Sequence, residues 1–382
     1  MKKKVALSVL LVLLLLGGIF IYKKVYFEYF SKNMSKVKQV TAITSKVVPV
    51  STNLGKNNKL HGKRIETLNT SLTQQHFMGA YIKTSGSKII NSDGFGQSNI
   101  LSQIEFSYNT TVRIGNLESL INTAILLKQV QEKKIDLTTN LKKYVPELSN
   151  VKSFNVKDLM RGSVNIWINK DKLANMNESQ ATRKFFNSVV TENQRKTGKR
   201  VANNILLAIV ISRIDQKKYS ELINDFENDL DLSGTTLLNG NNGGAKNDRN
   251  AAISYYYKAD SDGNPNPGKA YLNVDNHYTF GVDQLRMSMT DILNVIYALN
   301  TNEILSKPLE SELSLYYKSN EKYSIASGMF LDKESFSFSS KGYYISAKWS
   351  TKNKDMVLVV ENFPNKGLSR LNLASKVEKI TK

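Results

Sequence analysis

The sequence predicts an α/β protein of the α+β type, in which an antiparallel sheet is flanked by helices and joined to an all-helical region. Three observations support this fold class. A strand–turn–strand pattern lies near residues 77–91, apolar helical patterns fill the middle of the chain, and two β-rich runs follow near its end. Because strands at both ends enclose a run of helices, we expect the terminal strands to pair in one antiparallel sheet.

The first 24 residues have the pattern of a signal anchor. A basic start, Met1 to Lys4, precedes an almost wholly apolar run over residues 5–22, and Lys23 and Lys24 follow it. Bulky residues at the end of the apolar run disfavour cleavage, and the basic start favours an inside N-terminus. We therefore predict a single-pass transmembrane helix over residues 1–24 that holds the rest of the chain on the extracellular side of a cell membrane. A cleaved signal peptide stays the alternative.

Two further segments follow the predicted anchor. Residues 25–75 are polar, basic and weakly periodic, which is typical of a juxtamembrane linker. Residues 76–382 are predicted to form one extracytoplasmic domain, because a chain of 382 residues that is 41% hydrophobic can bury one large core.

The domain opens with a hairpin and closes with two strands. Its first strand is predicted over residues 77–83, with a Ser85-Gly86-Ser87 turn after it, and the last two strands over residues 342–350 and 355–361. Helices are predicted over residues 117–132, 203–215 and 290–299, and Asn- and Gly-rich loops over residues 239–250 and 260–268.

Composition excludes several kinds of site. The chain has no cysteine, which rules out disulfides, thiolate metal sites and a thiol nucleophile. Its three histidines, His61, His76 and His277, do not have metal-ligand spacing, so we predict no metal and no cofactor.

The formal net charge of +20 is spread along the chain without alternating aromatic residues, which disfavours nucleic acid as a partner. Much Lys, Asn and Ile without cysteine is typical of a Gram-positive surface protein. Outside a membrane this charge would face phosphate-rich wall polymers and anionic lipid headgroups. The alternative is that the charge only keeps the protein soluble.

Several blocks in succession resemble the serine β-lactamase and penicillin-binding-protein family, also called the β-lactamase-related serine hydrolases. They are, in chain order, Thr111–Gly115 (TVRIG), Gln131–Leu148, Phe154–Met160, Ser288–Asp291 and Met356–Asn362. The resemblance covers residues 76–366 and implies the β-lactamase/transpeptidase-like fold.

Acyl transfer in this family needs a serine at a helix N-terminus, a lysine one turn later and a tyrosine that passes the proton on. The resemblance places Asn116 at the nucleophile position and Ser119 at the lysine position. Aligning Asn203 with the asparagine of the family's Tyr-x-Asn element puts Val201 at the tyrosine position. None of the three substituting side chains can perform the chemistry of the residue it replaces.

The family's third element, a Lys-Thr-Gly or His-x-Gly strand, corresponds to Ser340, Lys341 and Gly342. Ser340 replaces the basic residue, and Lys341 lies one place away from it. The sequence therefore predicts a catalytically degenerate member of the family with no confident catalytic residue and with vestigial cleft positions at Asn116, Ser119, Val201, Asn203, Ser340, Lys341 and Gly342.

Three functional hypotheses follow. The leading one is a membrane-anchored pseudoenzyme that binds cell-wall material, such as peptidoglycan or teichoic acid, or an envelope partner. The second is an active envelope serine hydrolase, a D-alanyl esterase, D,D-carboxypeptidase or β-lactamase-like enzyme with unconventional residues. The third is an interaction module whose cleft is filled by side chains. The sequence does not identify the ligand or the oligomeric state.

Overall fold

The computed structural model describes residues 59–100, 102–115, 117–169, 173–191, 198–238, 250–256, 271–272, 278–300, 304–306, 330–332, 335–340, 342–350, 354–363, 374–375 and 377–378. The predicted anchor over residues 1–24 and most of the predicted linker lie outside these residues. Across the part of the chain that the structure describes, no helix combines the length and the apolar character that a membrane span requires.

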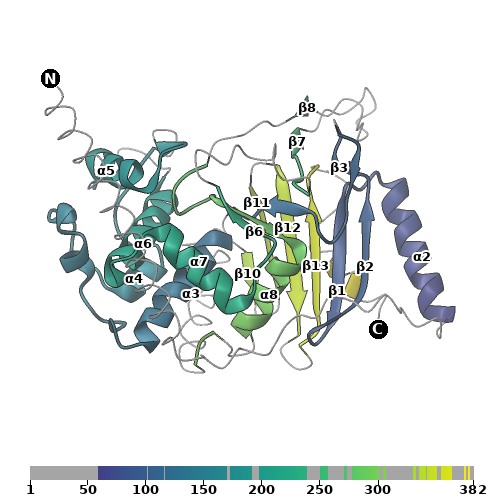
Figure 1. The fold of residues 1–382 in the computed structure, drawn as a ribbon, viewed down its shortest axis with the longest axis horizontal. Helices are drawn as coiled ribbons and strands as arrows, with labels where there is room; N and C mark the ends of the chain where they lie inside the picture. Colours follow the sequence, from purple (N-terminus) through teal and green to yellow (C-terminus); the bar gives the residue numbers. More distant parts are fainter. Residues whose placement is uncertain are drawn as a thin grey trace, which may run out of the picture. The chain divides into compact units, whose positions relative to one another are not determined.

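A six-stranded antiparallel sheet joins the two ends of the domain, with strand order β10-β11-β12-β13-β1-β2 (Figure 1). Strands β1 and β13 pair directly, with Gly79 opposite Glu361 and Thr84 opposite Met356. The prediction that the terminal strands share one antiparallel sheet is therefore confirmed. The strands are β1 (Gly79–Ser85), β2 (Lys88–Phe95), β10 (Phe330–Asp332), β11 (Ser335–Ser340), β12 (Tyr343–Trp349) and β13 (Met356–Glu361).

Strand β13 is buried on both faces because the sheet is covered on both sides. Leu358 and Val360 pack into the main hydrophobic core, whereas Val357 and Val359 pack into a second cluster on the opposite face. Side chains alternate between the faces of a strand, so burial of both faces requires an uninterrupted apolar run. The sequence MVLVVE supplies this run.

Helix α2 (Lys59–Gln74) contributes to the second cluster, although these residues were predicted to belong to the linker. Its Leu68 and Leu72 are buried against Tyr81, Val357 and Val359 of the sheet. Figure 1 shows α2 beside β1 and β2. The domain therefore begins before residue 76, and the polar composition of the helix conceals a narrow apolar stripe that contacts the sheet.

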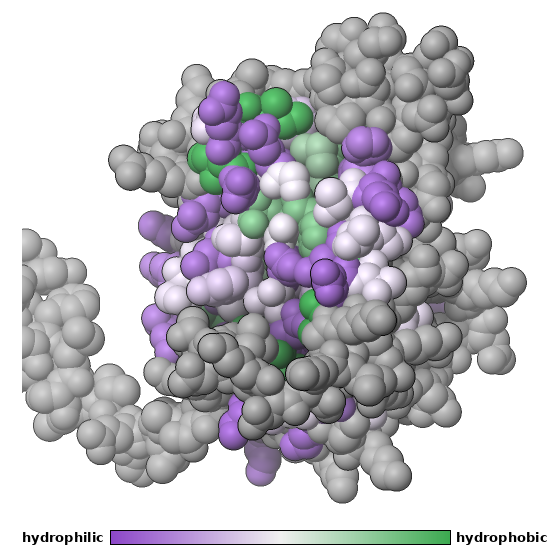
Figure 2. Space-filling view, turned by 90° about the vertical axis from the view of Figure 1, so that its right-hand side faces the viewer, coloured by the Kyte–Doolittle hydropathy of each residue, from purple (hydrophilic) through white to green (hydrophobic). Residues whose placement is uncertain are grey.

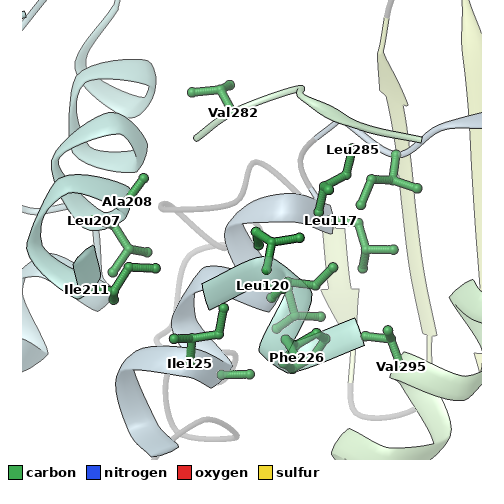
Figure 3. Close-up of a cluster of buried hydrophobic side chains, with 14 of the residues drawn as sticks. Leu117, Leu120, Ile125, Leu207, Ala208, Ile211, Phe226, Val282, Leu285 and Val295 are labelled. Atoms are coloured by element: carbon green, nitrogen blue, oxygen red, sulfur yellow. The ribbon is translucent and has the colours of Figure 1, made fainter. Parts of the chain in front are cut away.

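The helical region is organised around two buried helices, α3 (Leu117–Gln131) and α6 (Lys199–Asp215). In α6 every residue from Ala202 to Ser212 is buried, as expected for a helix that is apolar nearly all round. Figure 3 shows apolar side chains of both helices gathered with Phe226, Leu285 and Val295. The surrounding helices are α4 (Val156–Met160), α5 (Glu178–Ser188), α7 (Tyr219–Leu230) and α8 (Met289–Asn300), with short 3-10 turns η1 (Leu141–Tyr144) and η2 (Pro146–Leu148).

A small antiparallel sheet connects the helical region to the large sheet. Its order is β5-β9-β6, and it pairs Arg113 of β5 with Arg286 of β9, which in turn lies opposite Thr236 of β6. The strands are β5 (Thr111–Arg113), β6 (Thr235–Leu237) and β9 (Leu285–Ser288). Two short pairs complete the described strands: β3 (Gln97–Asn99) with β4 (Ile104–Glu105), and β7 (Tyr255–Tyr256) with β8 (Tyr271–Leu272).

Most predicted elements are confirmed. The predicted helices correspond to α3, α6 and α8, and the predicted closing strands to β12 and β13, with ends close to the expected residues. Helices α2, α5 and α7 were not predicted. The α+β class of the domain is therefore confirmed.

A hollow of about 540 Å³ lies at the end of α2, between Thr73 and the glycine-rich end of β2. Phe77, Met78 and Phe95 line it, with His76 as its one ionisable side chain. On the face that carries α2, hydrophobic side chains gather toward the upper part with hydrophilic ones around them (Figure 2). The lining contains no serine, lysine or tyrosine, the three side chains that the resembled family uses for acyl transfer.

Candidate functional site

The first turn of α3 carries two of the predicted cleft positions. The helix begins at Leu117, directly after Asn116, which lies outside the described residues. Ser119 is 1% exposed, and its Oγ has no hydrogen-bond partner. The residue that the resemblance places at the family's lysine position is therefore a buried hydroxyl that no lysine of the described residues hydrogen-bonds.

The first turn of α6 carries the next two positions. Val201 is partly buried and packs against the main hydrophobic core, so it presents no proton-transfer group. Asn203 is 1% exposed, and its Nδ2 donates to the carbonyl oxygens of Val164 and Lys199 at 3.0 and 2.9 Å. Its Oδ1 is buried without a partner. Although α3 and α6 pack together, Ser119 and Asn203 make no hydrogen bond to each other.

The start of α6 is fixed by a glycine. Gly198 has φ +97, and a Cβ placed there would lie 2.1 Å from the carbonyl oxygen of Ile168. Only glycine allows the two backbones to approach this closely. The segment from Val164 to Ile168 is thereby held against the start of α6.

The third predicted element lies where β11 ends and β12 begins. Ser340 is the last residue of β11 and lies opposite Tyr343, the first residue of β12. Gly342, between them, has φ +85, while Lys341 lies outside the described residues. A two-residue hairpin loop requires left-handed backbone, which glycine adopts most easily. Hairpin geometry therefore accounts for a glycine at position 342.

A buried carboxyl group that the sequence analysis did not single out lies beside Ser119. Glu118 Oε2 accepts hydrogen bonds from the backbone N–H groups of Gln284 and Leu285, at 2.6 and 3.1 Å. Its Oε1 lies 2.9 Å from the hydroxyl oxygen of Tyr219, which lies 2.9 Å from Asn122 Oδ1. Glu118 therefore connects the first turn of α3 to β9 and to α7.

The geometry of this network indicates that Glu118 is protonated. Asn122 Nδ2 donates to the carbonyl oxygen of Gly281, so Asn122 Oδ1 faces Tyr219 as an acceptor. The single Tyr219 proton cannot serve both Asn122 Oδ1 and an ionised Glu118. If Glu118 carries a proton, it donates to Tyr219, which donates to Asn122. Burial, with a smaller contribution from Asp283, raises the pKa of Glu118 from 4.5 to about 8, which agrees with this arrangement.

Glu118 holds α3 in place and is not suited to be a catalytic base. Both of its oxygens are engaged inside the protein, and the side chain is fully buried. A general base must reach the proton of a substrate or nucleophile within hydrogen-bond distance. The residue thus positions the first turn of α3, on which Ser119 lies.

Comparison with known proteins places this geometry in context. No family model matches the sequence. A teichoic acid D-alanine hydrolase of Staphylococcus aureus is 28% identical over 147 residues, a match that spans 38% of this chain and 37% of the relative.

The solved structures give a broader match. The crystal structure of FmtA from Staphylococcus aureus has a TM-score of 0.67 at 18% identity, covering 83% of this chain and 88% of FmtA. A penicillin-binding protein from Bacillus halodurans has a TM-score of 0.63 at 14% identity, covering 85% and 99%. A class C β-lactamase from Rhodobacter sphaeroides has a TM-score of 0.57 at 11% identity, covering 85% and 98%. The predicted resemblance is confirmed, and the domain has the fold that these proteins share.

Proposed function

We propose that this protein, which has the fold of the penicillin-binding proteins and class C β-lactamases, is an envelope pseudoenzyme that binds a wall polymer without forming an acyl-enzyme. The observation that carries the proposal is Ser119. At the position where the family has its lysine, the chain has a buried hydroxyl that receives no hydrogen bond.

Acylation in this fold needs three groups that act as a unit. A serine attacks the substrate, an adjacent amine keeps its hydroxyl deprotonable, and a tyrosine passes the proton to the leaving group. In a comparable catalytic set, loss of the nucleophile alone lowers the rate by roughly 10⁶. Here Asn116, Ser119 and Val201 replace all three groups, so no acyl-enzyme route remains at these positions.

Two features favour a polar ligand at the former catalytic cleft. Ser119 Oγ and Asn203 Oδ1 are buried without partners, although buried polar atoms are normally hydrogen-bonded. Both belong to first helical turns that the family fold places around its cleft. A ligand that supplied hydrogen-bond partners to these atoms would gain affinity from them.

A wall polymer is the ligand class that best fits the remaining observations. The curated relative acts on teichoic acid by its name, and this chain carries a formal net charge of +20, which attracts polyanions. The apolar run at residues 5–22 would hold the domain on the extracellular side of the cell membrane, where such polymers are located.

An active hydrolase is the second candidate, because the same relative is named as one. It would require a nucleophile at an unconventional position. The two candidates differ in whether a covalent adduct forms with a reactive substrate analogue.

The test is the intact mass of the full-length protein after incubation with a fluorophosphonate and, separately, with a penicillin. We expect no adduct on the folded protein. The comparison is a variant with the three family side chains restored, Asn116→Ser/Ser119→Lys/Val201→Tyr. The positive control is a class C β-lactamase. A stoichiometric adduct on one serine of the unaltered protein would contradict the proposal and identify the nucleophile.

A further inference from the structure

Arg286, on β9, is a buried guanidinium group that no carboxylate of the described residues pairs with. The residue is 5% exposed. Its Nη1 donates to two backbone carbonyl oxygens, those of Ala252 at 3.2 Å and Thr111 at 3.5 Å. Its Nε is buried and has no partner, and no acidic side chain of the described residues forms an ion pair with it.

The nearest arginine does not share a carboxylate with Arg286. Arg113 lies directly opposite in the β5–β9 pair, and its Nη2 donates to the backbone oxygen of Asp283 at 2.7 Å and to Asp283 Oδ1 at 3.2 Å. The carboxylate of Asp283 is therefore engaged by Arg113. Two guanidinium groups side by side on one face of a sheet repel each other, which makes the lack of a partner for Arg286 more unfavourable.

The described hydrogen bonds of Arg286 all use one end of its guanidinium group. Since Nη1 is used by the two carbonyls and Nε has no partner, the Nε–Nη2 edge is not engaged by the described residues. This edge binds one oxyanion through two parallel N–H···O bonds. The guanidinium group extends toward Thr111 of β5 and Ala252, away from Thr236 of β6.

Arg286 also lies close to the predicted cleft. The hydroxyl of Tyr343 donates to the carbonyl oxygen of Ala252 at 2.8 Å, and this carbonyl also accepts from Arg286. Tyr343 directly follows Gly342, one of the vestigial cleft positions. The unpaired charge is thus adjacent to the β11–β12 turn.

We propose that Arg286 forms an anion-binding subsite beside the cleft and that its ligand is the phosphodiester group of a wall polymer. This inference rests on the proposed function and names the part of the ligand that this residue recognises. An unpaired buried cation is unfavourable, and an anion that supplies the missing partner stabilises the folded protein. One positive charge matches a monoanion. A phosphodiester is a monoanion that repeats along a polymer, and the net charge of +20 favours a polyanion over a single carboxylate.

The test measures binding of glycerophosphoglycerol, a monoanionic phosphodiester, to the full-length protein by ³¹P line broadening at constant ionic strength, with acetate as the carboxylate competitor. We expect the unaltered protein to bind it, Arg286→Met to weaken binding at least tenfold, and Arg286→Lys to weaken it because an ammonium lacks the side-on fork. Arg161→Gln, which removes an exposed charge at the end of α4, is the matched control and should bind normally.

The melting temperatures of the variants provide an independent readout. Without ligand, Arg286→Met should melt no lower than the unaltered protein, because the substitution removes an unpaired buried charge. Glycerophosphoglycerol should raise the melting temperature of the unaltered protein and leave that of Arg286→Met unchanged. Equal binding by both proteins, no binding by the unaltered protein, or displacement by equimolar acetate would overturn the inference.

Retention of intact teichoic acid, measured in parallel, separates the two proposals. If both proteins retain the polymer equally, the Arg286 subsite is wrong and the proposed function stands. If neither retains it, the proposed function fails as well.

Discussion

Replacement of Glu118 by glutamine should remove a pH dependence of stability that the folded protein otherwise shows. Burial raises the pKa of Glu118 from 4.5 to about 8. The folded protein therefore keeps the proton to a higher pH than the unfolded chain does. The contribution of this group to stability is complete below about pH 4.5 and is lost as the pH rises toward 8.

The magnitude follows from that difference. A pKa that rises from 4.5 to about 8 corresponds to about 5 kcal/mol between the two pH limits, since each tenfold change in proton affinity is worth about 1.4 kcal/mol. Glutamine can replace protonated Glu118 without leaving a polar group unpaired. Its oxygen can accept from the N–H groups of Gln284 and Leu285, and its amide can donate to Tyr219.

The assay is urea unfolding of the two proteins at a series of pH values from 5 to 8.5. We expect similar stability at pH 5 and a growing advantage for Glu118→Gln above pH 6. The matched control is Glu105→Gln, at an exposed position, which should retain the pH dependence of the unaltered protein. Parallel curves for the unaltered protein and Glu118→Gln would refute the conclusion that Glu118 is protonated in the folded state.

Three further substitutions test packing, and Gly86→Ala serves as the control for Gly281→Ala. Gly281→Ala should destabilise the protein by about 2–4 kcal/mol, because φ is +68 and the new Cβ would lie 2.4 Å from the Cβ of Ala208. Gly86→Ala, with φ +56 and no atom within 4 Å of the new Cβ, should cost only about 1 kcal/mol in urea unfolding; equal losses at the two sites would argue against the close contact. Leu72→Ala should cost about 2–4 kcal/mol because Leu72 attaches α2 to the sheet, and an unchanged urea midpoint would show that α2 is not part of the cooperative domain.

Helices and strands with a strong local pattern of apolar residues could be predicted from the sequence. The apolar run of α6, the pattern of β12 and the uninterrupted apolar run of β13 each predicted an element close to its observed ends. Helix α7 could also have been predicted, because Tyr219, Leu222, Ile223 and Phe226 have the spacing of one buried helical face. The capping box of Asn177 and Gln180 is a comparable signal for the start of α5.

The contacts of the candidate site could not be predicted from the sequence, because they join residues that lie far apart in the chain. Glu118 has no local signal, since its partners Tyr219 and Gln284 lie 101 and 166 residues away. Arg286 has no local signal either. Its lack of a carboxylate partner could not be predicted, because it depends on Arg113 of the neighbouring strand, which forms an ion pair with Asp283. By contrast, the assignment of Asn116, Ser119 and Val201 to the family's catalytic positions is a prediction that rests on the resemblance alone. The structure adds that Ser119 is buried without a partner and that Val201 packs against the core.

The most direct test of the central claim follows polymer binding and D-alanine release in the same sample. Full-length protein would be incubated with D-alanylated teichoic acid, and both bound polymer and free D-alanine would be measured over time. Binding without hydrolysis predicts retained polymer and D-alanine release at the rate of a protein-free control. Release that increases in proportion to protein concentration would contradict the claim and establish an active hydrolase.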